Sequence, residues 1–185
     1  MDTKKKKSTF WEFFQGLGKT FMLPVALLAF MGILLGLGSS FSSESMIQTL
    51  PFLGYPAVKA VFQFMSAIGG FAFTYLPVMF AMAIPLGLVR KEKGVAAFSG
   101  FVGYTVMNLA INFYLVLTNR LVDADHLREA GQGMVFGIQT IEMGVLGGII
   151  AGIIVYKLHN RFYTVQLPDS FAFFSGAHLY RLSLL

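Results

Sequence analysis

The sequence contains no cysteine and few charged side chains. Because cysteine is absent, the chain forms no disulfide, offers no thiolate to a metal and has no cysteine nucleophile or phosphocysteine. Charged residues make up 12% of the chain, against about 25% in a typical soluble domain. This shortage of charge, together with 56% apolar residues and a mean hydropathy of +0.69, indicates a polytopic membrane protein.

The sequence also lacks the motifs that common enzyme chemistries need. It has no phosphate-binding glycine loop, no zinc motif and no nucleophile paired with a base. The acidic loop around Asp123, Asp125 and His126 has neither a glycine-turned calcium loop nor a second histidine. We therefore expect no catalytic group, no metal site and no cofactor on this chain.

The longest charge-free stretch is Ala60–Val89, which ends at the basic cluster that begins with Arg90. As one helix it would reach about 45 Å, at about 1.5 Å per residue, whereas the hydrocarbon core of a bilayer is about 30 Å thick. We predict a membrane span here, which Pro77 and Pro85 kink or split into a short extension. Three other spans are predicted, at Thr20–Phe41, Gly94–Asn119 and Met134–Tyr156.

The predicted fold is all-α, with four transmembrane helices, the start of a fifth in Leu167–Gly176, and an amphipathic N-terminal helix. Residues 1–18 form a basic tail and this interfacial helix, Ser8–Gly18, which reads equally well as the start of the first span. With four spans, all three basic clusters fall on one side of the membrane; they are Lys4–Lys7 with Lys19, Arg90 with Lys91 and Lys93, and Lys157 with Arg161. The positive-inside rule therefore places the N-terminus in the cytoplasm. Orientation and anionic lipid explain the net charge of +5 better than nucleic acid does.

Three polar side chains interrupt the predicted spans. Asn108 and Asn112 lie one helical turn apart, and we expect them to bond neighbouring helices rather than to line a substrate path. Glu142 falls within the predicted fourth span. Structural hydrogen bonding is the preferred role for this acid, and a direct role in transport, as in a proton-coupled carrier, is the alternative.

Glycines four residues apart indicate close helix packing. Gly144, Gly148 and Gly152 make one face of the fourth span a smooth groove, which is a stronger signal than the pair Gly32 and Gly36. For the pair, packing within the chain is preferred to a dimer contact. The glycine groove also supports an alternative function, a small accessory membrane protein that acts by helix–helix assembly.

Several stretches resemble, in order, one family of bacterial permeases. Leu76–Phe98 is similar to the second-helix signature of the phosphotransferase-system sugar permeases, the IIC components of the glucose/maltose/glucoside group. The similarity is greatest to the maltose/glucose type of enteric bacteria. The motif residues are Leu76, Pro77, Phe80, Pro85, Gly87 and Gly94. Other matching stretches are Trp11–Leu28, Gly137–Gly152, His159–Phe162 and Leu167–Pro168.

The resemblance implies a homodimeric permease of the bacterial inner membrane. Residues 19–176 would be the N-terminal scaffold and dimerisation half of its IIC domain. A IIB phosphocarrier domain or subunit would phosphorylate a glucose- or maltose-type sugar as the sugar is released inside. The family's sugar-contacting Glu and His lie in a later half, so we assign no substrate residue and no catalytic residue of the phosphotransferase to this chain.

The sequence departs from the family pattern after Gly176. Family members continue the fifth helix with Phe-Val-Pro-Ile-Ile-Ser, whereas this chain has Leu179–Ser183, which a shifted reading frame of that segment would encode. Arg181 also disfavours membrane insertion at this point. We therefore expect residues 177–185 to be an aberrant tail, and the chain to be a truncated permease that is inactive alone.

Overall fold

The computed structural model describes residues 2–163 of the chain. The predicted start of a fifth span, Leu167–Gly176, and the predicted aberrant tail at residues 177–185 lie outside the described residues. The described part contains six α-helices, two short 3-10 helices and one two-stranded antiparallel hairpin. The fold is therefore mostly helical, as predicted, but it is not purely α.

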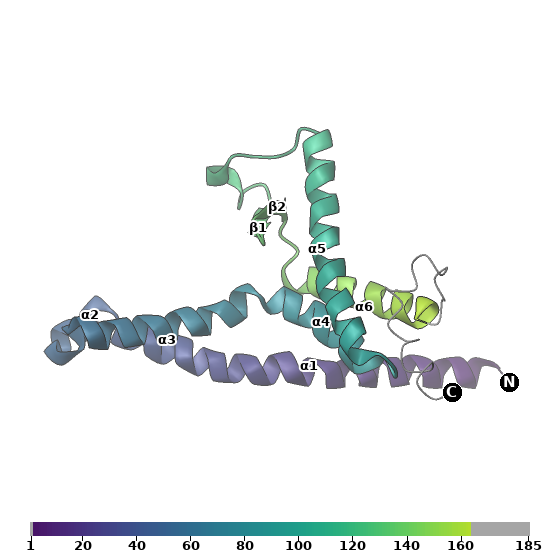
Figure 1. Cartoon of the computed structure of the whole chain (residues 1–185), viewed down its shortest axis with the longest axis horizontal. Helices are drawn as coiled ribbons and strands as arrows, with labels where there is room; N and C mark the ends of the chain where they lie inside the picture. Colours follow the sequence, from purple (N-terminus) through teal and green to yellow (C-terminus); the bar gives the residue numbers. More distant parts are fainter. Residues whose placement is uncertain (1, 164–185) are drawn as a thin grey trace, which may run out of the picture.

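Helix α1, Asp2–Phe41, is one continuous helix. The predicted interfacial helix and the predicted first span are thus two parts of the same element. A short turn follows, made of α2, Glu44–Thr49, and the 3-10 helix η1, Pro51–Gly54. Helix α3, Pro56–Thr74, then returns beside α1 in the opposite direction (Figure 1).

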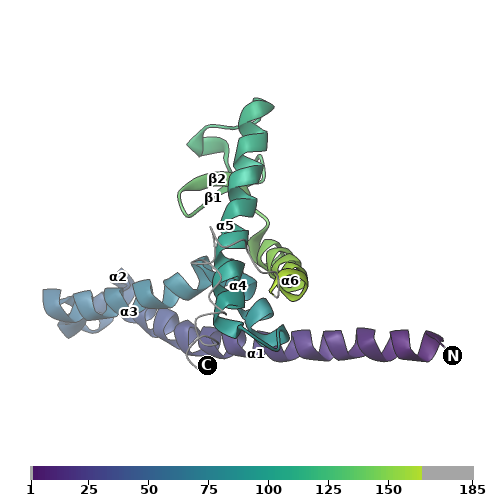
Figure 2. The same ribbon diagram turned by 45° about the vertical axis from the view of Figure 1, so that its right-hand side comes forward.

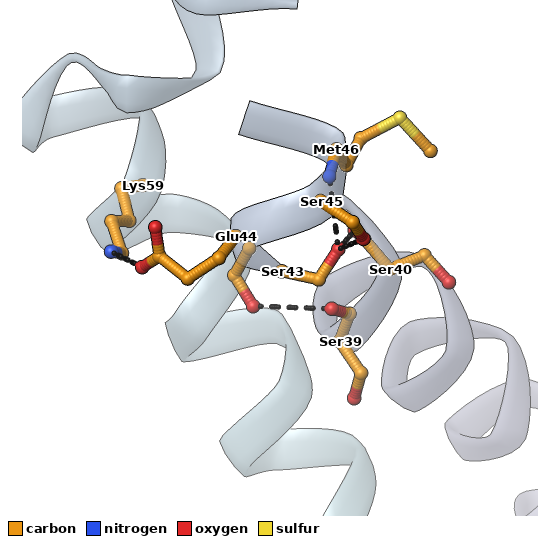
Figure 3. Close-up of polar contacts among 8 residues, drawn as sticks. Ser39, Ser40, Ser43, Glu44, Ser45, Met46 and Lys59 are labelled. Atoms are coloured by element: carbon orange, nitrogen blue, oxygen red, sulfur yellow. Dashed lines mark hydrogen bonds and ion pairs between the residues drawn. The ribbon is translucent and has the colours of Figure 1, made fainter. Parts of the chain in front are cut away.

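Polar contacts hold the turn between α1 and α3 (Figure 3). The hydroxyl of Ser43 accepts a hydrogen bond from the Met46 amide at 3.4 Å and caps α2. The Lys59 ammonium lies 3.0 Å from the Glu44 carboxylate, and the Ser39 and Ser66 hydroxyls lie 2.9 Å apart across the two helices. The segment between α1 and α3, where Pro51, Gly54 and Pro56 predict a short loop with a half-buried turn, therefore contains helical structure of its own.

The predicted span Ala60–Val89 is divided into two helices. Helix α3 ends at Thr74, and α4, Leu76–Leu88, begins after Tyr75. Pro77 lies in the first turn of α4, where its fixed φ suits a helix start and its missing N–H costs nothing. The split that the two prolines predict is confirmed, and the break lies at Tyr75, with Pro85 inside α4.

Helix α5, Lys93–Leu117, follows a tight turn in which Glu92 has a φ of +52°. It runs across the direction of α1 and projects beyond the other helices, as both views show (Figure 1, Figure 2). Its bounds lie close to those of the predicted third span, Gly94–Asn119. The loop after it contains the 3-10 helix η2, Ala124–His126.

The predicted fourth span, Met134–Tyr156, is wrong in its first part. Residues Gln132–Val135 (β1) and Ile138–Ile141 (β2) form an antiparallel hairpin in which Gln132 pairs with Ile141. Its two-residue turn has a positive φ at both Phe136 and Gly137, the backbone that matches the twist of paired strands. Helix α6 begins only at Gly144 and runs to Phe162.

Among residues 2–163, three helices are long and apolar enough to cross a membrane by length and composition. They lie at Trp11–Phe41, Pro56–Thr74 and Lys93–Leu117, and α4 is a shorter apolar helix. Helix α6 has a length similar to that of α3 but carries Lys157 and Arg161 near its end. The chain is a multi-pass membrane protein, and the predicted number of four spans holds only roughly.

Candidate functional site

The junction of α4, α5 and α6 brings together several of the residues singled out in the sequence. Its buried core is made by Val78 and Ala81 of α4, Tyr104 of α5 and Ala151 of α6. Partly buried Tyr75, Met82, Met107 and Val135 pack against this core. This junction contains a buried cluster contributed by three helices, and we treat it as the candidate functional site.

Glycines let the backbones of α5 and α6 approach α4. A Cβ atom at Gly148 would overlap the Pro77 carbonyl, and one at Gly152 would lie 3.0 Å from the Cβ of Ile84. On the α5 side, a Cβ atom at Gly100 would overlap the Ala81 carbonyl. Helix α4 is therefore held between two small-residue surfaces.

The glycine face of α6 is thus covered by α4 of the same chain. This arrangement removes the basis for the alternative accessory function, in which Gly144, Gly148 and Gly152 would bind another chain. Gly144 makes no such contact, because a Cβ atom there would meet nothing within 4 Å. Its φ of +53° instead suits the point where the backbone leaves the hairpin and enters α6.

The pair Gly32 and Gly36 does not form the close contact in α1. A Cβ atom at Gly36 would meet nothing within 4 Å, and one at Gly32 would make ordinary contact, at 3.8 Å, with the Phe73 ring. Gly38 lies against the backbone of Ser66, and Gly69 of α3 lies against the backbone of α1. The sequence located the right helix for close packing but the wrong glycines.

The family-motif residues of α4 lie against both α6 and α1. Phe80 is buried and meets Phe21 of α1 edge to face, with ring centroids 4.9 Å apart. A Cβ atom at Gly87 would overlap the Thr20 side chain. Pro85 is fully buried, whereas a Cβ atom at Gly94, the last motif residue, would meet nothing within 4 Å.

The two asparagines of α5 bond different partners from those predicted. The Asn108 amide is buried and donates to the Tyr104 carbonyl of its own helix at 2.8 Å. The Asn112 amide donates to the Gln139 carbonyl of β2 at 2.7 Å. Neither of these bonds reaches a neighbouring helix, and the second one fastens the hairpin to α5.

Glutamine side chains continue this attachment of the hairpin. The Gln139 amide donates to the Val122 carbonyl and to the Gln132 side-chain oxygen, both at 2.8 Å. The Gln132 amide donates to the Arg120 carbonyl at 2.7 Å. The loop after α5 and the hairpin therefore form one hydrogen-bonded unit.

Phe136, at the tip of the hairpin, reaches the break between α3 and α4. Its ring lies 5.8 Å from that of Tyr75 in a stacked arrangement and 5.6 Å from that of Phe101. Sequence reasoning missed this contact because it placed Phe136 in a helix. The Phe-Gly pair between two short β-prone runs was the signal that could have revealed the turn.

Glu142 lies outside the membrane-spanning helix in which the sequence placed it. It follows β2 and precedes α6, its side chain is exposed, and its amide donates to the Gly131 carbonyl at 3.0 Å. Among residues 2–163, no three His, Cys, Asp or Glu side chains are close enough together to hold a metal ion. The contacts described at this site are those of a packed helix junction.

A model of the family described as "Phosphotransferase system, EIIC" matches residues 18–184. The chain belongs to the EIIC family. This match includes α1 from Gly18 onward and every later element of the described structure. The EIIC domain is thus the context in which the junction of α4, α5 and α6 is to be understood.

Two relatives show which members of the EIIC family the chain is similar to. The maltose-specific EIICB component of the phosphotransferase system of Escherichia coli K12 is 59% identical over 174 residues, which cover 92% of this chain and 32% of the relative. The glucose-specific EIICBA component of Staphylococcus saprophyticus is 40% identical over 164 residues, which cover 88% of this chain and 23% of the relative. The chain spans about a third or less of the length of these curated relatives.

Proposed function

We propose that this chain supplies the N-terminal scaffold of a permease that imports a glucose- or maltose-type sugar and couples import to phosphorylation. The observation that carries the proposal is the 59% identity to the maltose-specific EIICB component over 92% of this chain. The packed junction of α4, α5 and α6 supports it. Many transporters work by moving one bundle of helices against another, so a rigid bundle is a functional part in itself.

The proposed partner in phosphorylation is a IIB domain, either fused to the permease or separate. Both relatives are named as components in which B accompanies IIC. This chain has no cysteine and so carries no phosphocysteine of its own. Its proposed contribution to the phosphotransferase is therefore to hold the transport path, while the partner brings the phosphoryl group.

The proposed orientation places the N-terminus and the α4–α5 turn in the cytoplasm. Cytoplasmic ends of membrane spans are enriched in Lys and Arg. Most of the basic residues of this chain lie in Lys4–Lys7, in the α4–α5 turn with Arg90, Lys91 and Lys93, and at the end of α6. The loop with η2 and the hairpin would then face the opposite side. In the four-span arrangement that opposite side has only three isolated basic residues, Lys59, Arg120 and Arg128.

We further propose a homodimer in which α5 contributes to the interface. Helix α5 projects beyond the other helices (Figure 2), and its Leu109, Phe113 and Leu117 are exposed. A cross-linker that joins two thiols should therefore join copies carrying Phe113→Cys more efficiently than copies carrying Met22→Cys on α1, which is also exposed. Equal cross-linking at both positions, or none at Phe113→Cys, would argue against this interface.

A chimera tests the proposed transport function. Residues 11–163 of this chain replace the matching segment of the E. coli maltose-specific EIICB component, and uptake of labelled maltose is measured in membrane vesicles supplied with phosphoenolpyruvate. We expect uptake that depends on phosphoenolpyruvate, because the exchanged segment should provide the same scaffold. A chimera that enters the membrane at normal levels but takes up no maltose would contradict the proposal.

Two glycine variants of the chimera, one a test and one its matched control, examine the junction. Gly148→Leu should abolish uptake, because a side chain at this position cannot fit against Pro77. Gly36→Leu makes the same chemical change where a Cβ atom would meet nothing within 4 Å, so uptake should persist. The comparison separates a specific loss of the junction from a general effect of adding bulk to a membrane helix.

A further inference from the structure

A small basic cavity lies where α4 ends, α5 begins and α6 ends. It has a volume of about 290 Å³ and is lined by Leu88, Arg90, Lys91, Tyr156, His159, Asn160 and Tyr163. Two of these side chains are cationic, and four others carry hydroxyl, imidazole or amide groups that can donate hydrogen bonds. Glu92, the carboxylate of the same turn, does not line the cavity.

Contacts within α6 and between elements border this cavity. The Nε2 atom of His159 lies 3.2 Å from the Lys91 carbonyl oxygen, and it ties α6 to the α4–α5 turn when it carries a proton. The His159 and Tyr163 rings stack with centroids 5.8 Å apart. Tyr156 meets Phe13 of α1 at 6.0 Å, so α1 passes beside the same wall.

The electrostatics of the cavity favour an anion. Arg90 and Lys91 bring two positive charges to the lining of the cavity. The negative end of α6 is offset by Arg161 in its last turn. The ligand that this set of groups suits best is a phosphate, because a phosphate accepts hydrogen bonds from Arg, Lys and neutral donors at once.

The position of the cavity along the helices favours a phospholipid headgroup over a soluble phosphate. The apolar run of α4 ends at Leu88, and the charge-free part of α6 ends before Lys157, so both helices change from apolar to basic at this point. Exposed apolar side chains lie close in sequence to the residues that line the cavity. They are Leu158 and Phe162 of α6 and Phe98 of α5. A phospholipid has a headgroup for the basic cavity and acyl chains for such side chains, whereas a soluble phosphate has only the first.

We propose that this cavity binds the headgroup phosphate of an anionic phospholipid. Basic cavities between transmembrane helices on the cytoplasmic side are suited to such headgroups. Under the proposed orientation the lipid belongs to the cytoplasmic leaflet. By joining α6 to the α4–α5 turn, the bound lipid stabilises the end of the junction that lies opposite the hairpin.

Lipid binding by the full chain in detergent tests the proposal. Native mass spectrometry measures the affinity for phosphatidylglycerol and, in parallel, for phosphatidylcholine with the same acyl chains. We expect preferential binding of one phosphatidylglycerol. Arg90→Gln and Lys91→Gln should each weaken it about fivefold, as expected for removing one basic residue near an anionic headgroup. Lys93→Gln is the matched control, because it removes the same charge from the same turn but does not line the cavity.

A neutral variant and a soluble competitor complete the experiment. Asn160→Ala should weaken binding without changing the net charge, because it removes a hydrogen-bond donor from the cavity. An equal effect of Lys93→Gln and Lys91→Gln would overturn the proposal in favour of diffuse attraction to the basic turn. Displacement of the lipid by millimolar inorganic phosphate would overturn the lipid as the ligand and indicate a site for a soluble phosphate.

Discussion

At the scale of single residues, the distance between α6 and α4 is set by the absence of a side chain at Gly148. The backbone of this residue lies against the Pro77 carbonyl, and Gly152 repeats the arrangement one turn later against Ile84. In a bilayer, lipid removes most of the hydrophobic drive for helices to associate, so close backbone packing of this kind carries much of the stability.

Replacing Gly148 by alanine should destabilise the chain by about 1–3 kcal/mol, the usual cost of overpacking a filled contact. Thermal unfolding in detergent, followed by size-exclusion chromatography, measures the change. Gly36→Ala is the control, because a Cβ atom there meets nothing within 4 Å. Alanine favours helix over glycine by up to about 1 kcal/mol, so Gly36→Ala should leave the melting temperature unchanged or raise it. Equal losses in the two variants would refute this role of Gly148.

Asn112 should matter for the hairpin rather than for the helices. Its amide donates to the Gln139 carbonyl at 2.7 Å, and such a bond contributes about 1 kcal/mol. We expect Asn112→Leu to increase hydrogen exchange at Ile138–Ile141. Thr105→Val removes a bond within α5 alone, so it should leave exchange in the hairpin unchanged. Unaltered exchange in Asn112→Leu would show that other contacts hold the hairpin.

At the scale of elements, the hairpin is placed so that its tip covers the break between α3 and α4. Tyr75, at the break, contacts both Phe71 of α3 and Phe136 of the turn. The break is where the chain changes from the α1–α3 pair to the junction of α4, α5 and α6. The hairpin therefore supports the point at which these two parts of the molecule meet.

Phe136→Ala should loosen this support. Each aromatic pair contributes about 0.5–1.5 kcal/mol beyond its buried area, and Phe136 makes ring contacts with Tyr75, Phe101 and Tyr104. We expect faster hydrogen exchange around Tyr75 and a lower melting temperature. Met134→Ala changes an exposed side chain of the same hairpin and should have a much smaller effect. If both variants behave alike, the tip does not hold the break.

The sequence predicted the elements whose signals are local and missed those that depend on distant partners. The bounds of α5, the proline-dependent split near Pro77 and the packing role suggested for Gly148 follow from hydropathy, proline geometry and glycine spacing. The hairpin was missed because Met134–Ile141 is apolar enough to pass for part of a span. Its partners, Asn112 and Tyr75, lie far away in the sequence, and this error placed Glu142 inside a helix.

At the scale of the whole molecule, the basic turn at one end of the junction and the hairpin at the other predict opposite exposure across the membrane. The absence of cysteine allows single cysteines to report this directly. A membrane-impermeant maleimide should label Asp125→Cys in intact cells, because this side chain is exposed in the loop after α5. Lys93→Cys should react only in inverted vesicles, and the reverse pattern would overturn the proposed orientation.

Resemblance to a family identified the permease domain from the sequence, but the arrangement of its helices required the structure. The stretch from Leu76 to Gly94 was recognisable by its motif. The contacts of this stretch are visible only in the structure. Phe80 and Gly87 contact α1. Pro77 and Ile84 contact α6. Helix α4 thus packs against α1, α5 and α6, although it is the shortest of the apolar helices in the described part of the chain.

If α4 and α6 form the rigid scaffold of a permease, a disulfide should join them. The Cβ positions of Ile84 and Gly152 lie 3.0 Å apart, and a separation of α6 from α4 by about half an ångström brings them into the range of about 3.5–4.5 Å that a disulfide spans. Ile84→Cys with Gly152→Cys should cross-link, so that cleavage at a protease site added between Asp123 and Glu129 leaves the fragments joined until reduction. The control pair is Ile84→Cys with Ile154→Cys, which is exposed on α6. Efficient linkage of the first pair alone is the predicted result, and linkage of the control pair instead would contradict the scaffold.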